Sequence, residues 1–138
     1  KNRDFLILSP FKTADEVTEF LIQENTKEVN FPIKLTFSTV DSVIEASNKT
    51  IFTDAEKLQF PLILRRWNEG DVFEPFGMNG QSKKVSKFFK DEKLSVLEKE
   101  KTWLLCSGNE IVWIVGQRAD DRFKVSDSTT NILQIVLS

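Results

Sequence analysis

The stretch from Phe60 to Lys90, FPLILRRWNEGDVFEPFGMNGQSKKVSKFFK, decides how this chain folds. It begins with an apolar run typical of a buried strand and continues through a loop that contains three glycines. It ends in a lysine-rich segment with helical spacing, which is the basic cluster of a chain whose net charge is −2. We therefore expect this stretch to supply part of the core and a binding surface.

The composition of the 138 residues predicts one globular domain, with 40% apolar and 29% charged residues. A domain of this length buries roughly two thirds of its unfolded surface without disulfides. No apolar run approaches the ~20 residues of a membrane-spanning helix. The single cysteine, Cys106, fits a reducing cytoplasm, and we expect it to be buried in a strand. These features predict a cytoplasmic protein with no membrane partner.

The sequence contains no histidine, and this restricts the chemistry that it can support. Histidine is the commonest general base near neutral pH and the commonest metal ligand. The glycines at 70, 77 and 80 match neither a P-loop nor a dinucleotide-binding motif, so we expect them to form turns. The chain opens with Lys1 instead of methionine, which favours a piece of a longer protein. We predict no catalytic residue, no metal and no cofactor in this piece.

The hydrophobic pattern predicts an α+β domain, with a mixed β-sheet and a few packed helices. Strands are expected over residues 5–8, 33–37, 50–53, 62–67, 103–106, 111–115 and 132–137, with a hairpin across residues 107–110. A capping-box sequence from Thr13 to Glu16 predicts a helix over residues 14–24. We expect a single domain, 1–138, with an N-terminal lobe over residues 1–50 and a core over 51–138. A boundary near Asn48 is the alternative.

A second helix is predicted at the lysine-rich end of the opening stretch, with Ser82 as its N-cap. Val85, Phe88 and Phe89 then share an apolar face that we expect to be core. The opposite face carries four cations: Lys83, Lys84, Lys87 and Lys90. Two of them fall in the first turn, where the helix dipole disfavours cations by about 0.3–1 kcal/mol each. A local rule broken in this way favours phosphate binding; a solvated face is the alternative.

Two pairs of adjacent charged residues are also candidates for a site. Arg65 and Arg66 lie in a predicted strand, which sends neighbouring side chains to opposite faces. One of them should form a structural ion pair while the other reaches solvent or phosphate, and the pattern does not say which. Asp120 and Asp121 are flanked by arginines on both sides, which favours charge neutralisation over acid–base catalysis.

A long ordered set of motifs runs through about residues 50–138. The set comprises Phe60-Pro61-Leu62, Leu64-Arg65-Arg66-Trp67, Gly70-Asp71, Pro75 with Gly77-Met78, Lys83-Lys84 with Ser86 and Phe88-Phe89, Ile111-Val112-Trp113 with Gly116, and Asp121-Arg122-Phe123-Lys124-Val125. In order and spacing it resembles the C-terminal domain of the tRNA(Ile)-lysidine synthetases. Two positions depart from the family pattern, namely Lys87 in place of an acidic residue and Trp103 in place of a common proline.

The resemblance implies a role in RNA modification. Enzymes of this family use ATP to adenylate the wobble cytidine of an isoleucine tRNA with a CAU anticodon, and then join lysine to that base. ATP and lysine bind to an N-terminal domain with an S-G-G-x-D-S loop, whereas the Ser-Gly pair here, Ser107-Gly108, continues as Asn109-Glu110. The resemblance thus implies a non-catalytic tRNA-recognition module, similar in fold to a domain of the phenylalanyl-tRNA synthetase beta subunit.

We therefore predict that the chain binds tRNA(Ile) and acts with the enzyme's own N-terminal catalytic domain. The predicted tRNA-binding side chains are Arg65, Arg66, Lys83, Lys84, Lys87, Lys90 and Arg122. The alternative is a structural or interaction domain that packs on the catalytic domain or forms a homodimer, with its lysines merely solvated.

Overall fold

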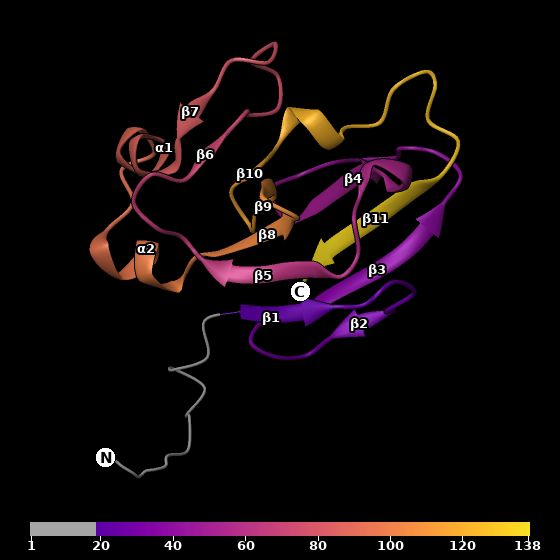
Figure 1. The fold of residues 1–138 in the computed structure, drawn as a ribbon, viewed down its shortest axis with the longest axis horizontal. Helices are drawn as coiled ribbons and strands as arrows, with labels where there is room; N and C mark the ends of the chain where they lie inside the picture. The colour runs from indigo at the N-terminus through magenta and orange to yellow at the C-terminus, as the bar shows by residue number, and fades with distance from the viewer. Residues whose placement is uncertain (1–18) are drawn as a thin grey trace, which may run out of the picture.

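The computed structural model describes residues 19–138, which form two antiparallel β-sheets, a short hairpin and two helices (Figure 1). The first sheet has the strand order β1-β5-β8-β9-β10, and its strands are β1 (Glu19–Ile22), β5 (Leu62–Arg66), β8 (Trp103–Ser107), β9 (Glu110–Ile114) and β10 (Arg118–Ala119). The second has the order β2-β3-β11-β4, and its strands are β2 (Glu28–Val29), β3 (Leu35–Val40), β11 (Ile132–Leu137) and β4 (Thr50–Asp54).

A short hairpin and both helices lie between β5 and β8 in the sequence. The hairpin consists of β6 (Val72–Phe73) and β7 (Lys83–Lys84), and it leads into the helices α1 (Val85–Asp91) and α2 (Val96–Lys101). Two 3-10 turns, η2 (Ala55–Lys57) and η3 (Asp121–Phe123), complete the described part. The α+β class is confirmed. The single mixed sheet is wrong, because every strand pair formed between residues 19 and 138 is antiparallel and the strands divide between two main sheets.

The centre of the first sheet is buried on both of its faces, as β8 shows. Trp103 and Leu105 belong to the core shared with the second sheet, whereas Leu104 and Cys106 belong to the core beneath α1 and β6. Side chains that alternate between two cores leave no solvent-facing position from residue 103 to residue 106, which explains the continuous apolar run there. Figure 1 shows α1, α2 and the β6–β7 hairpin at one end of this sheet, with β3, β4 and β11 beside the other.

Residues 19–50 contribute strands to both sheets and pair with strands from the rest of the chain. Strand β1 pairs with β5, and strand β3 pairs with β11. The helix predicted over residues 14–24 is wrong from Glu19 onward, because Phe20 and Ile22 alternate inward along a strand. Phe20 contacts Trp103 edge-on at 5.6 Å between ring centroids, so tertiary packing overrides the local helical pattern. The strand predicted over residues 5–8 lies outside the described residues.

The hairpin and the closing strand agree with the sequence. Strands β8 and β9 are joined by the two residues Gly108 and Asn109, and Gly108 has a φ of 58° that suits such a tight turn. Strand β11 covers the predicted residues 132–137. Between residues 19 and 138, no helix is long and apolar enough to cross a membrane, and no cluster of three or more potential ligands could hold a metal ion.

Candidate nucleic-acid interface

Lys83 and Lys84 lie in a strand and not in the first turn of the basic helix. They form β7, where Lys83 pairs with Phe73 and Lys84 with Val72 of β6. Helix α1 begins at Val85, whose N–H donates to the Asp71 carbonyl oxygen at 2.9 Å. The predicted start at Ser82 is therefore wrong, because pairing with β6 holds both lysines extended. Neither lysine lies in the first helical turn, although Lys84 is the N-cap of α1.

The apolar face of α1 matches the prediction. Val85, Phe88 and Phe89 are buried against the first sheet. Phe88 meets Phe73 edge-on at 5.4 Å between ring centroids, and Phe89 meets Trp67 at 5.2 Å. These aromatic contacts fix α1 on the sheet, so its opposite face is held in a defined position. The two phenylalanines are core residues and are not available to stack on bases.

Asp91 changes the balance of charge on the basic face. Its carboxylate lies 2.6 Å from the Lys83 Nζ and 3.5 Å from the Lys87 Nζ. The hydrogen bond from Lys83, together with the charges of both lysines, lowers the pKa of Asp91 below its usual value. Lys83 is mostly buried, and its Nζ lies 5.8 Å from the centroid of the Phe88 ring. One of the four predicted lysines thus has a structural partner, and a second shares it.

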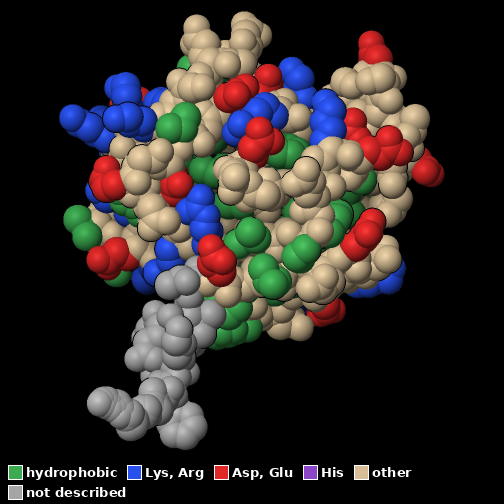
Figure 2. Space-filling view, in the orientation of Figure 1, with side chains coloured by type: hydrophobic (Ala, Val, Ile, Leu, Met, Phe, Trp, Pro, Cys, Tyr) green, Lys and Arg blue, Asp and Glu red, His purple; other side chains and the backbone are tan. Residues whose placement is uncertain are grey.

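The other cations of this region remain open to solvent. We define the lysine surface as the exposed Lys84, Lys87, Lys90 and Lys93 on α1 and at its two ends. Of these four, Lys87 alone forms an ion pair with another residue of the range 19–138, and 66% of its side chain stays exposed. Figure 2 shows Lys and Arg side chains gathered over α1 and β7, at the upper left of the molecule.

The sequence contained a signal for Lys93 that the prediction missed. Residues 83–101 hold seven lysines against four acidic residues, a local charge of +3 in a chain whose total charge is −2. The excess of positive charge continues past Lys90, where the predicted cluster stopped. The structure therefore assigns the positive charge to the whole helical corner formed by β7, α1 and α2.

The two neighbouring arginines of β5 have different partners, as the alternation of a strand requires. Arg65 forms two hydrogen bonds with the carboxylate of Asp71, at 2.9 and 3.0 Å, and the bond to Asp71 raises the pKa of Arg65. Arg66 is exposed, lies over the Trp103 ring at 4.3 Å and donates to the carbonyl oxygen of Glu100 in α2. The predicted structural ion pair is confirmed and belongs to Arg65, whereas Arg66 presents its charge beside the helical corner.

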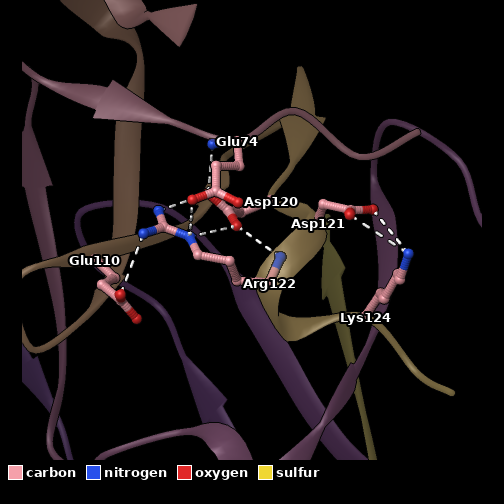
Figure 3. A network of polar contacts seen from close by, with 6 residues as sticks. All are labelled: Glu74, Glu110, Asp120, Asp121, Arg122 and Lys124. Carbon is pink, nitrogen blue, oxygen red and sulfur yellow. Dashed lines mark hydrogen bonds and ion pairs between the residues drawn. The ribbon is translucent and has the colours of Figure 1, made fainter. Parts of the chain in front are cut away.

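Arg122 is enclosed by three carboxylates (Figure 3). Its guanidinium contacts Asp120 at 2.9 Å, Glu110 at 3.1 Å and Glu74 at 3.6 Å. The Asp120 side chain is fully buried, with 0% exposure, and its hydrogen bonds to Arg122 raise the pKa of the guanidinium. We call these four residues the Arg122 network. The predicted neutralisation by an arginine is confirmed for Asp120, whereas Asp121 pairs with Lys124 at 3.2 Å. The charge of Arg122 is already balanced within the protein.

The segment from Arg118 to Asp120 fixes the loop between β6 and β7. The Glu74 N–H donates to the Asp120 carboxylate at 2.9 Å, and the Phe76 N–H donates to the Ala119 carbonyl oxygen at 2.9 Å. In return, Arg118 donates to the Phe76 carbonyl oxygen through Nε at 3.2 Å and Nη2 at 2.8 Å. Hydrogen bonds in both directions hold the loop in one position, although its tip is exposed.

Comparison with known families extends these observations. The family model described as the TilS substrate C-terminal domain matches residues 62–136, a little over half of the chain. The tRNA(Ile)-lysidine synthase of Parabacteroides distasonis is 46% identical over 138 residues, which cover 96% of this chain and 31% of that protein. The corresponding protein of Bacteroides thetaiotaomicron is 36% identical over 133 residues, which cover 96% and 29%. The chain spans about a third of the length of these relatives.

A solved structure supports the fold independently. A crystal structure described as the TILS C-terminal domain superposes with a TM-score of 0.73, and the match covers 87% of this chain and 96% of that chain. The two sequences are only 16% identical in this match, so the likeness concerns the fold alone. Together with the match to residues 62–136, these findings show that the chain belongs to the TilS substrate C-terminal domain family.

Proposed function

We propose that this chain is the tRNA-binding part of a tRNA(Ile)-lysidine synthetase. In this proposal a separate N-terminal domain binds ATP and lysine and modifies the wobble cytidine, in the cytoplasm, while the present domain recognises the tRNA. The names of the relatives support the parent enzyme. The kinship with a domain of the phenylalanyl-tRNA synthetase beta subunit belongs to the same proposal. Superposing the two structures tests that kinship.

The lysine surface is the observation that carries the proposal. Exposed ammonium groups on a rigid helix face bind backbone phosphates regardless of base sequence, and they release condensed counterions when they do so. The deep major groove of A-form RNA resists side-chain contact, so backbone and shape should dominate recognition. Contacts from Lys84, Lys87, Lys90 and Arg66 would give a slope of log K against log salt on the order of −3 to −4.

Charge reversal tests the lysine surface. We would measure binding of tRNA(Ile) by fluorescence anisotropy over a range of salt concentrations, for the unmodified chain and for the triple variant Lys84→Glu, Lys87→Glu, Lys90→Glu. The salt slope should become shallower by about three, because three phosphate contacts are lost. Unchanged affinity and slope in the variant would remove the lysine surface from the proposal.

A matched control separates this surface from the total charge. The triple variant Lys27→Glu, Lys34→Glu, Lys49→Glu changes the net charge by the same amount, but it alters exposed lysines around the second sheet. It should retain most of the salt slope of the unmodified chain. An equal loss in both triple variants would indicate non-specific attraction between the protein and RNA.

A structural role is the second candidate, and an exposed apolar pair favours it. Val96 and Leu97 at the start of α2 are 67% and 58% exposed. Such a pair fits a contact with the catalytic domain or with a second copy of the chain. Sedimentation velocity over a range of protein concentrations tests the dimer, with Leu97→Asp as the variant that should abolish it. A chain that stays monomeric and binds tRNA would contradict the dimer.

A further inference from the structure

A cavity of about 320 Å³ opens where the two sheets meet the β6–β7 loop. Four aromatic residues contribute to its lining, namely Phe52 from β4, Phe76 from the loop, Trp113 from β9 and Phe123 from η3. Two cations, Arg118 and Lys124, also line it. The volume lies at the lower end of the roughly 300–1,000 Å³ typical of small-ligand sites. Aromatic walls with nearby positive charge suit a planar group attached to an anion.

Phe76 is an exposed aromatic residue on a fixed loop. Half of its surface is exposed, at 50%, yet its N–H and its carbonyl oxygen both hydrogen-bond to the segment that contains Ala119 and Arg118. Glu74, two residues earlier, is held by the buried carboxylate of Asp120. Because the backbone of Phe76 is held on both sides, little loop entropy is lost when a flat ligand stacks on its ring. The loop therefore has the properties of a stacking platform.

Trp113 supplies an unsatisfied polar group in the wall of the cavity. Its side chain is fully buried, and its indole Nε1 has no hydrogen-bond partner among residues 19–138. A buried donor without an acceptor costs about 1–3 kcal/mol, so such groups are uncommon. Because Trp113 lines the cavity, its indole N–H is a sensitive reporter of a ligand bound there.

We propose that this cavity binds one unpaired nucleobase of the RNA, with the base stacked on Phe76. This inference rests on the proposed function and specifies which part of the RNA is recognised. Single-stranded RNA is bound by stacking its bases on aromatic side chains beside cations that contact the backbone. Arg118 uses two of its five N–H donors on the Phe76 carbonyl oxygen, which leaves three for a phosphate. Lys124 also lines the cavity, but it pairs with Asp121 at 3.2 Å, so Arg118 is the cation assigned to the phosphate.

The nearby carboxylates do not oppose this assignment, because each is already matched. Asp120 is held by Arg122, and Asp121 lies 3.2 Å from Lys124. The site is distinct from the lysine surface, because its lining residues lie on β4, β9, β10, η3 and the adjoining loops. We therefore expect the lysine surface to bind paired backbone and the cavity to bind an unpaired base next to it.

A direct test uses NMR of the isotopically labelled chain with adenosine 5′-monophosphate. Trp67, Trp103 and Trp113 give three indole N–H signals, of which Trp113 alone lines the cavity. Addition of the nucleotide should shift the Trp113 signal and the Phe76 ring signals, and leave the other two indoles in place. Ribose 5-phosphate, which lacks the base, should shift neither. Equal shifts with both compounds, or no shift of Trp113, would overturn the inference.

A second arm measures RNA affinity with two hairpins of equal stem length, one with a single-stranded 3′ overhang and one blunt. Phe76→Ala should weaken binding of the overhanging hairpin roughly 5- to 100-fold, because one stacked base is lost, and change binding of the blunt hairpin less than twofold. Phe76→Trp should restore binding. Phe31→Ala, which removes an exposed aromatic side chain outside the cavity and away from the lysine surface, serves as the matched control.

The two arms separate this inference from the proposed function. If RNA binds but Phe76→Ala affects both hairpins equally or not at all, the base site is wrong while tRNA binding stands. If the nucleotide shifts Trp113 but the chain binds no RNA, the cavity accepts bases and the proposed function fails. If Phe76→Ala instead alters self-association in sedimentation, the cavity is a protein contact and the inference is overturned.

Discussion

Arg122 and Lys87 are both cations in contact with carboxylates, but their surroundings differ. Arg122 bridges three carboxylates, one of which is fully buried. Lys87 shares the exposed carboxylate of Asp91 with Lys83, and most of its side chain meets solvent. Charge enclosed by acids fixes the geometry of a loop, whereas charge left open is available to another molecule. Burial of the partner, and not the presence of a cation in the sequence, separates these two roles.

The largest expected effect is on the Arg122 network. Arg122→Met leaves the buried Asp120 carboxylate without its cation, which should lower the free energy of unfolding by about 3 kcal/mol. Urea unfolding followed by tryptophan fluorescence measures the change. The double variant Arg122→Met, Asp120→Asn should recover part of the loss, because the neutral amide needs no counter-ion. A loss below about 0.5 kcal/mol in the single variant would mean that the network does not fix the loop.

The pKa of the Cys106 thiol reports whether the charge of Arg65 is balanced by Asp71. Burial raises the pKa of this thiol to about 11, although the neighbouring guanidinium of Arg65 lowers it. A thiol whose pKa is higher when folded stabilises the protein below its unfolded pKa, near 9, and the stability is lost as the pH rises towards 11. We expect the free energy of unfolding to fall by about 2 kcal/mol between these pH values.

The corresponding variant is Cys106→Ala, in which the decrease over this pH window should be smaller. Asp71→Asn removes the carboxylate that holds Arg65 and should lower the pKa of Cys106, as measured by the pH dependence of alkylation. An unchanged alkylation profile would show that Arg65 does not influence the thiol.

Asp91 pairs with one mostly buried lysine, Lys83, and with one exposed lysine, Lys87. Removing the charge of its carboxylate should strengthen RNA binding. Asp91→Asn frees Lys83 and Lys87 from their shared carboxylate, so the affinity for tRNA should rise several-fold and the salt slope should become steeper by about one. Anisotropy titrations at several salt concentrations measure both. Glu24→Gln, an exposed charge removal next to β1, is the matched control. A weaker or unchanged affinity in Asp91→Asn would place the RNA elsewhere.

The smallest expected effect is that of the lysine surface on stability. Lys84→Ala, Lys87→Ala and Lys90→Ala should each change the free energy of unfolding by less than about 0.5 kcal/mol, because their ammonium groups are solvated. Thermal unfolding followed by circular dichroism measures this. A loss comparable to that of Arg122→Met would show that these lysines are structural and remove the contrast between the two regions.

The sequence predicted the elements whose pattern is local. The β8–β9 hairpin follows from two apolar runs around Gly108, and β11 follows from six consecutive residues of strand-like pattern. Ser82 resembled an N-cap, but pairing with Val72 and Phe73, about ten residues earlier, extends the next two residues instead. An N-cap is recognised from a few neighbouring residues, whereas the strand that pairs with Lys83 and Lys84 lies outside those neighbours.

The part of the candidate site that depends on local sequence was predicted, and the part that depends on distant residues was not. Alternation along β5 correctly separated Arg65 from Arg66, because strand geometry depends on neighbouring residues alone. Asp91 was not predicted as part of the site, because it pairs with Lys83, which lies in strand β7 and not in the predicted helix. The cavity could not be foreseen, since its lining comes from residues as distant as Val43 and Val125.

The central place of β11 has a consequence for synthesis of the protein. Strands β3 and β4 each pair with β11 and not with one another, so β3, which also pairs with β2, cannot be joined to β4 before residues 132–137 leave the ribosome. At roughly 5–20 residues per second, Leu35 and Phe37 of β3 wait on the order of 5 to 20 seconds for their partner strand. During translation these core residues are exposed to chaperones and to other nascent chains.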